Sequence, residues 1–152
     1  MAGRNCWIGV VTRDHVALGV AGGYAQLNHG RAATLERMRE GDGFAYYSPR
    51  AAHPDGEPVQ AFTAIGVVAP GPLWQVDAGP DWKPFRRAIT YWPGQAAPIK
   101  PLLPDLTFIR SKQHWGAAFR FGVVRVPEGD FARIAAAMGV AGFATAFAPA
   151  PP

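Results

Sequence analysis

Short apolar runs separated by turn residues dominate the chain, and their pattern predicts a domain of short strands. The run from Asn5 to Thr12 is rich in β-branched and aromatic residues, which is typical of a buried strand. A similar run from Gly43 to Ser48 should end at Pro49, because proline cannot donate a hydrogen bond to a strand ladder. The run from Val59 to Val68 is apolar on both alternations, which favours a central strand covered on both faces.

The other strand candidates are weaker because proline and glycine interrupt them. They span Trp74 to Val76, Phe85 to Tyr91 and Pro98 to Lys100, and the segment from Leu102 to Ile109 favours a short helical turn. From Phe119 to Val126 the alternation of apolar residues changes phase, so this strand is predicted to carry a β-bulge at Gly122.

Three short helices are expected between the strands. Thr12 is a suitable N-cap for the first, which Gly19 should end. The second runs from about Arg31 to Met38. The third shows the spacing of an amphipathic helix from Phe131 to Met138, preceded by Pro127.

The pattern as a whole predicts a single α+β domain over residues 1–138, built as a small mixed β-barrel with short helices packed at its rim. Closing the strands into a barrel removes exposed sheet edges, which favour aggregation. Residues 20–30 are punctuated by glycine and should form a closely packed loop. Residues 139–152 are rich in Ala and Pro and are expected to form a frayed C-terminal tail.

The composition indicates many turns and a net positive charge. The 152 residues include 18 Gly and 15 Pro, and Lys and Arg outnumber Asp and Glu by 15 to 11. Twelve of the basic residues are arginine, whose planar guanidinium pairs with phosphate and stacks on flat rings. This bias points to an anionic or nucleic-acid partner, although a GC-rich genome would produce it as well.

Several classes of function are disfavoured. The single Cys6 cannot form an internal disulfide, and there is neither a signal-like start nor an apolar run of membrane-spanning length, so a cytoplasmic setting without membrane partners is expected. No metal site or cofactor is expected, because the four histidines are far apart in the sequence and the glycine-rich stretch lacks a nucleotide-binding fingerprint. A catalytic triad of Ser48, His29 and Asp14 is conceivable, but Ser48 lacks the strand-turn-helix context of a nucleophile elbow. We therefore expect a protein that is not an enzyme.

Aromatic and polar side chains instead suggest a pocket for a flat ring. The aromatic candidates are Trp7, Tyr24, Tyr46, Tyr47, Trp115 and Phe119, and the polar or cationic candidates are Asn28, His29, Ser48, Arg50, Arg86, Arg87, Lys112 and Arg120. Each aromatic residue alone is better explained by core packing. Together they match a site that stacks on a base and hydrogen-bonds its edge.

Six motifs in chain order resemble the EVE domain family. They are WIGVVTRDHV (7–16), GVAGGYAQLNHGRAA (19–33), YYSPR (46–50), QAFTAIG (60–66), PFRR (84–87) and WGAAFRFG (115–122). The resemblance identifies residues 1–138 as an EVE domain of the PUA-like type, a compact mixed barrel. One departure is the run Asn28 to Arg31, NHGR, where the family leads us to expect CHGK.

The resemblance implies a reader that captures a flipped, modified base, with modified cytosine in DNA, such as 5-methylcytosine, favoured. The implied base-binding residues are Val11, Thr12, Arg13, Gly22, Gly23, Tyr24, Gln26, His29, Tyr47, Ser48, Trp115 and Phe119. The expected phosphate-binding residues are Arg50, Arg86, Arg87 and Arg120. Tyr24, Tyr47 and Trp115 would stack on the base. A nuclease partner is possible, and a general RNA-binding module of the PUA-like type is the alternative.

Overall fold

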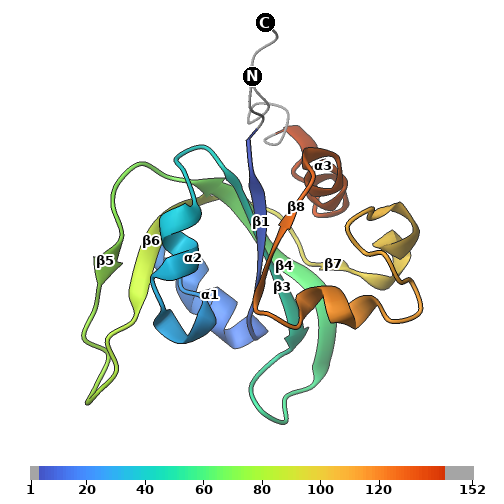
Figure 1. The fold of residues 1–152 in the computed structure, drawn as a ribbon. Coiled ribbons are helices and arrows are strands. Elements are labelled where there is room, and N and C mark those ends of the chain that lie inside the picture. Colours follow the sequence, from blue (N-terminus) through green and yellow to red (C-terminus); the bar gives the residue numbers. More distant parts are fainter. Residues whose placement is uncertain (1–3, 143–152) are drawn as a thin grey trace, which may run out of the picture.

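A mixed β-sheet that curls into a half-barrel forms the centre of the molecule (Figure 1). The computed structural model describes residues 4–142. Its strands are β1 (Cys6–Val10), β2 (Tyr24–Ala25), β3 (Gly43–Arg50), β4 (Pro58–Val68), β5 (Trp74–Gln75), β6 (Phe85–Tyr91), β7 (Ala97–Pro98) and β8 (Val123–Val126). The main strand order is β2-β6-β4-β3-β1-β8, with β5 paired to β6 and β7 paired to β4. The predicted α+β fold, a small mixed barrel with short helices, is confirmed, and the sheet takes the form of a curled half-barrel.

Short helices cover the two faces of this sheet. They are α1 (Arg13–Gly22), α2 (Ala33–Arg37) and α3 (Glu128–Ala137), with 3₁₀ segments η1 (Asn28–Gly30), η2 (Lys100–Asp105) and η3 (Trp115–Phe119). In Figure 1, α1 and α2 lie on one side of β1 and β3, and α3 lies on the other. The sheet therefore separates two hydrophobic cores.

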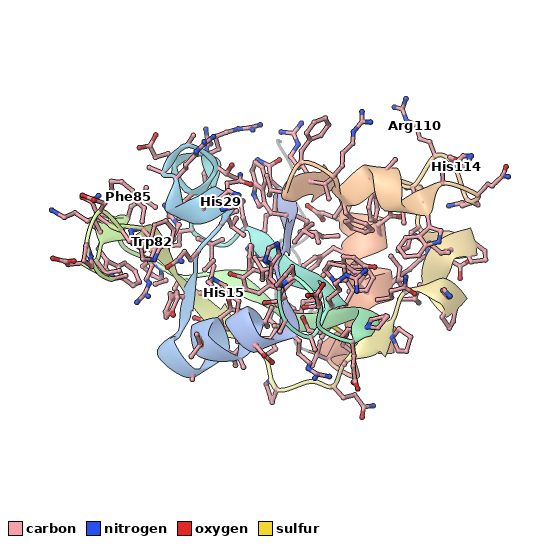
Figure 2. All side chains as sticks on the ribbon, turned by 90° about the horizontal axis from the view of Figure 1, so that it is seen from below. His15, His29, Trp82, Phe85, Arg110 and His114 are labelled. Carbon is pink, nitrogen blue, oxygen red and sulfur yellow. The ribbon has the colours of Figure 1, made fainter. Side chains whose placement is uncertain are left out.

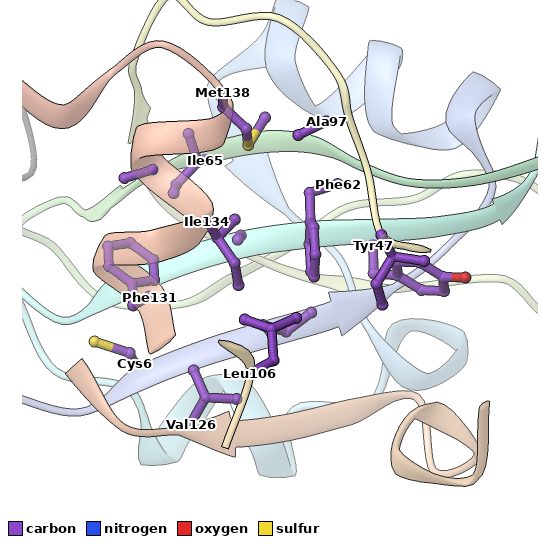
Figure 3. Packing of buried hydrophobic residues seen from close by; sticks show 14 of the residues in the cluster. Cys6, Tyr47, Phe62, Ile65, Ala97, Leu106, Val126, Phe131, Ile134 and Met138 are labelled. Carbon is purple, nitrogen blue, oxygen red and sulfur yellow. The ribbon is translucent and has the colours of Figure 1, made fainter. Parts of the chain in front are cut away.

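Alternation along β3 divides its side chains between these cores. Phe44 and Tyr46 pack with residues of α1 and α2, whereas Ala45 and Tyr47 pack with residues of α3 and η3 (Figure 3). Adjacent strand residues point to opposite faces, so a strand buried on both faces reads as one continuous apolar run. Strand β1 pairs in parallel with β3 and antiparallel with β8, which fixes it on both sides.

Three local predictions are wrong, each for a physical reason. Helix α1 does not end at Gly19 but continues to Gly22, because Gly19 lets the helix approach the Tyr24 backbone and Gly23 supplies the left-handed cap. Residues 20–30 are therefore not a single loop, since the end of α1, β2 and η1 occupy most of them. Strand β3 runs past Pro49 to Arg50, because the register shift there removes the need for a proline N–H.

The third correction concerns the predicted bulge at Gly122. Phe119 ends η3, and β8 begins only at Val123, so Gly122 lies in the intervening turn with φ +81°. At the C-terminal end the core extends to Val140, which is buried. Residues 143–152 of the expected tail lie outside the described residues.

Candidate functional site

A pocket of about 310 Å³ opens where β1 ends and the chain turns into α1. This volume is at the lower end of the range of small-ligand sites, roughly 300–1,000 Å³. The lining residues come from five segments and are Val10, Val11, Thr12, His15, Gln26, Leu27, Asn28, His29, Gly30, His53, Trp82 and Gly122. We call it the β1 pocket. Figure 2 shows His15, His29 and Trp82 in the same part of the molecule, far from His114.

One wall of the β1 pocket is an unusually tight turn. Asn28, His29 and Gly30 have φ values of +48°, +57° and +79°, so three consecutive residues adopt the left-handed region. A side chain at Gly30 would overlap Pro84, because the turn packs directly against the segment that carries Trp82. The Asn28 side chain stabilises the turn by donating from Nδ2 to Thr34 Oγ1 at 3.1 Å.

The polar wall is fixed by hydrogen bonds to Gln26. Its backbone N–H donates to the buried Tyr46 hydroxyl at 3.1 Å, and its side-chain Oε1 accepts from Arg86 Nε at 3.0 Å. With the oxygen engaged, the NH₂ group is the donor that this side chain offers a ligand. The Thr12 hydroxyl accepts from the His15 backbone N–H at 3.4 Å, as the predicted N-cap of α1.

The Arg86 guanidinium places a positive charge beside this polar wall. Burial and the nearby Arg86 guanidinium lower the pKa of His15 from its ordinary value of 6.5, so the ring is neutral at pH 7. A neutral imidazole both donates and accepts hydrogen bonds, which suits recognition of a heterocycle edge. The Arg86 guanidinium lies 4.0 Å from the centre of the Tyr24 ring, which holds it beside the pocket.

Trp82 is a lining residue that the sequence interpretation missed. Its side chain is 39% exposed and lies beside Gly30, so one part of the indole is available to a ligand. The signal was present in the sequence, because a Trp in the turn-forming run GPDWKP is not needed by any strand pattern. His15 and His53 were likewise absent from the predicted site, whereas Asn28 was one of the polar candidates but was not among the implied base-binding residues.

A second hollow of about 300 Å³ lies on the other side of β1, and we call it the η3 hollow. Tyr47 and Phe119 stack there with ring centres 4.2 Å apart, and Trp115 meets Tyr47 edge-on at 6.4 Å. Tyr47 is only 2% exposed, and burial raises its pKa to about 12. Tyr47 and Phe119 therefore belong to the core, in which Figure 3 shows Tyr47, and the partly buried Trp115 packs against it.

The structure divides the predicted base-binding residues between the β1 pocket, the η3 hollow and positions outside both. Val11, Thr12, Gln26 and His29 line the β1 pocket, whereas Tyr47, Trp115 and Phe119 line the η3 hollow. Gly22 and Gly23 lie at the far end of the ten-residue helix α1, about 15 Å from Thr12 along the helix axis. The Tyr24 ring packs over Gly22, and Arg13 is exposed on the first turn of α1. The structure does not bring Tyr24, Tyr47 and Trp115 into one slot.

Ser48 lies away from the β1 pocket. It is fully buried, and its hydroxyl lies 2.7 Å from Thr63 Oγ1. A buried hydroxyl is not accessible to a substrate. The Ser48 hydroxyl also contacts Thr63 and not His29, the partner that the conceivable triad requires.

The predicted phosphate-binding arginines are also dispersed. Arg86 adjoins the β1 pocket through Gln26, and Arg120 lines the η3 hollow. Arg50 is exposed and donates to the Gly56 carbonyl oxygen at 3.2 Å. Arg87 is half-buried, and its Nε has no hydrogen-bond partner among the described residues.

Residues 4–142 contain neither a candidate metal site nor a candidate membrane-spanning helix. No three His, Cys, Asp or Glu side chains in this part of the chain are grouped so that they could hold a metal ion. None of the helices described here combines the length and apolar character needed to cross a bilayer.

Comparisons of the sequence with known proteins identify its family, and a solved structure shares its fold. The family model of the EVE domain matches residues 5–137. A UPF0310 protein of Mycolicibacterium vanbaalenii is 49% identical over 132 residues, covering 87% of this chain and 91% of that protein. The UPF0310 protein YdcG of Bacillus subtilis is 44% identical over 136 residues, covering 90% and 93%. A crystal structure of an Agrobacterium tumefaciens protein superposes with a TM-score of 0.54 at 13% identity, covering 90% of this chain and 94% of that one.

Proposed function

Because the chain belongs to the EVE domain family, whose PUA-like fold commonly binds nucleic acids, we propose that it captures a modified base extruded from a nucleic acid. Modified cytosine in DNA is the favoured ligand, and the β1 pocket is the site. The observation that supports this proposal is the composition of that pocket. It combines an exposed indole, hydrogen-bonding side chains and an apolar niche, with an arginine held beside it.

Each part of the pocket matches a part of the base. Trp82 offers a face for stacking, the Gln26 amide and neutral His15 offer a donor and an acceptor for the base edge, and the partly exposed Val11 offers apolar surface to a methyl group. Arg86 and the net positive charge favour the attached phosphate. Binding alone accounts for these features, so no catalytic step is proposed.

The expected discrimination is modest. Burial of one methyl group contributes about 0.8 kcal/mol, which corresponds to roughly a fourfold difference in Kd. We therefore expect calorimetric titration to give a severalfold lower Kd for a DNA duplex with one 5-methylcytosine than for its unmodified twin. Equal affinities for the plain duplex and for a panel of modified-cytosine duplexes would overturn the proposal.

A general RNA-binding module is the second candidate, supported by the same basic charge. Competition between a structured RNA and the modified DNA duplex distinguishes the two candidates. The first predicts that modified DNA displaces RNA more effectively than plain DNA does. Preference for RNA regardless of DNA modification would favour the second.

A further inference from the structure

Phe121 is the most exposed of the large hydrophobic side chains in residues 4–142, at 74%. It lies in the turn between η3 and β8, where its neighbour Phe119 is buried against Tyr47. Single exposed apolar side chains are common on protein surfaces, so the exposure of Phe121 becomes informative only through the residues around it.

The ring lines a hollow of about 480 Å³ that adjoins the β1 pocket. Asn28, His29 and Gly122 line both, so the two spaces share a wall. Phe121 is bonded directly to Gly122, and consecutive Cα atoms are only about 3.8 Å apart. A ligand that occupies the β1 pocket and extends across this wall therefore lies next to the Phe121 ring.

Charge around this hollow favours phosphate. Arg31 and Arg120 are exposed and line it together with His29. The Arg120 guanidinium lies 4.7 Å from the centre of the Phe121 ring, so the cation and the aromatic face form one unit. None of the described residues that line this hollow, the β1 pocket or the η3 hollow is acidic.

We propose that this hollow binds the nucleotides beside the captured base, with Phe121 stacking on the neighbouring base while Arg31 and Arg120 bind its phosphates. The inference rests on the proposed function and deepens it, because it makes the substrate a strand rather than a free nucleoside. Aromatic side chains next to cationic ones are how proteins hold successive bases of a strand. A ring entering the stack also fills the gap left by an extruded base.

The test uses two probes with the full chain. One is a DNA duplex containing a single 5-methylcytosine, and the other is free 5-methyl-2′-deoxycytidine, used as a competitor. Phe121→Ala should weaken binding of the duplex by about fivefold to 140-fold, the loss expected for one stacked base. Its affinity for the nucleoside should stay within twofold of the unchanged protein.

Further variants separate stacking from a structural effect. Phe121→Trp should retain duplex affinity and Phe121→Leu should lose it, because only a ring can stack. Arg120→Ala should reduce the salt dependence of duplex binding by about one counterion, whereas Arg125→Ala, an exposed arginine of β8 outside this hollow, should not. An RNA duplex of the same sequence shows whether the strand is DNA or RNA.

The outcomes distinguish the two proposals. If the unchanged protein binds modified and plain duplexes equally, the proposed function fails. If it prefers the modified duplex but Phe121→Ala or Phe121→Leu binds that duplex as tightly, the present inference alone fails. Equal losses for duplex and nucleoside would also overturn it, because they would assign Phe121 to the structure of the pocket.

Discussion

Replacing Trp82 by Ala should remove the stacking face of the β1 pocket, and Trp74 provides a matched control. Both indoles are 39% exposed and lie in the region of β5 and β6, but only Trp82 lines the pocket. An aromatic side chain of this size offers up to about 250 Å², so 39% leaves roughly 100 Å² for a ligand. At about 25 cal/mol per Å², covering half to all of this area contributes about 1.2 to 2.5 kcal/mol.

Loss of that contact corresponds to Kd values about 8-fold to 60-fold higher for Trp82→Ala with the modified duplex. Trp74→Ala should bind as the unchanged protein does. Fluorescence anisotropy of a labelled duplex measures both, and thermal unfolding shows whether the two variants are equally folded. Equal affinities of Trp82→Ala and Trp74→Ala, in folded proteins, would refute the assignment of the indole to the site.

Three further changes test the framework of the pocket. Tyr46→Phe should lower the free energy of unfolding by about 1–3 kcal/mol in urea titrations, because it leaves the buried Gln26 N–H without an acceptor. Gly122→Ala should cost about 1–3 kcal/mol in the same assay, since φ is +81° and the new methyl would overlap Asn28. Stability should fall as the pH drops below about 6.5, because burial lowers the pKa of His15 in the folded state and the unfolded chain binds the proton more readily. His15→Gln should remove that part of the pH dependence, and an unchanged pH profile in this variant would contradict the assignment.

The strands were predictable where the apolar pattern is continuous, and the site was not predictable from residue type. The runs that became β1, β3 and β4 needed only local patterning. Adjacent Tyr46 and Tyr47 look equivalent in the sequence, yet alternation sends one toward each core, and both are buried. Local pattern does not reveal which rings face water, because exposure depends on the pairing of distant strands.

The walls of the β1 pocket differ in how they are held in place. Val10 pairs with Tyr47 on β3, and its N–H donates to the Gly122 carbonyl oxygen at 2.9 Å. The sheet therefore fixes this wall, and changes to it would affect the fold. The opposite wall is the turn at Asn28, which is held by its own hydrogen bond to Thr34.

This turn contains the run Asn28 to Arg31, NHGR, where the resemblance leads us to expect CHGK. Asn28 replaces an expected cysteine, and its amide donates to Thr34 while its oxygen packs against Gly122. Asn28 thus stabilises the turn, and the next residue, His29, lines the pocket. Exchanges in this turn can alter the shape presented to a base without disturbing the sheet, because the turn's hydrogen bonds are local. Selectivity within this fold should therefore depend on the turn and on Trp82 more than on the strands.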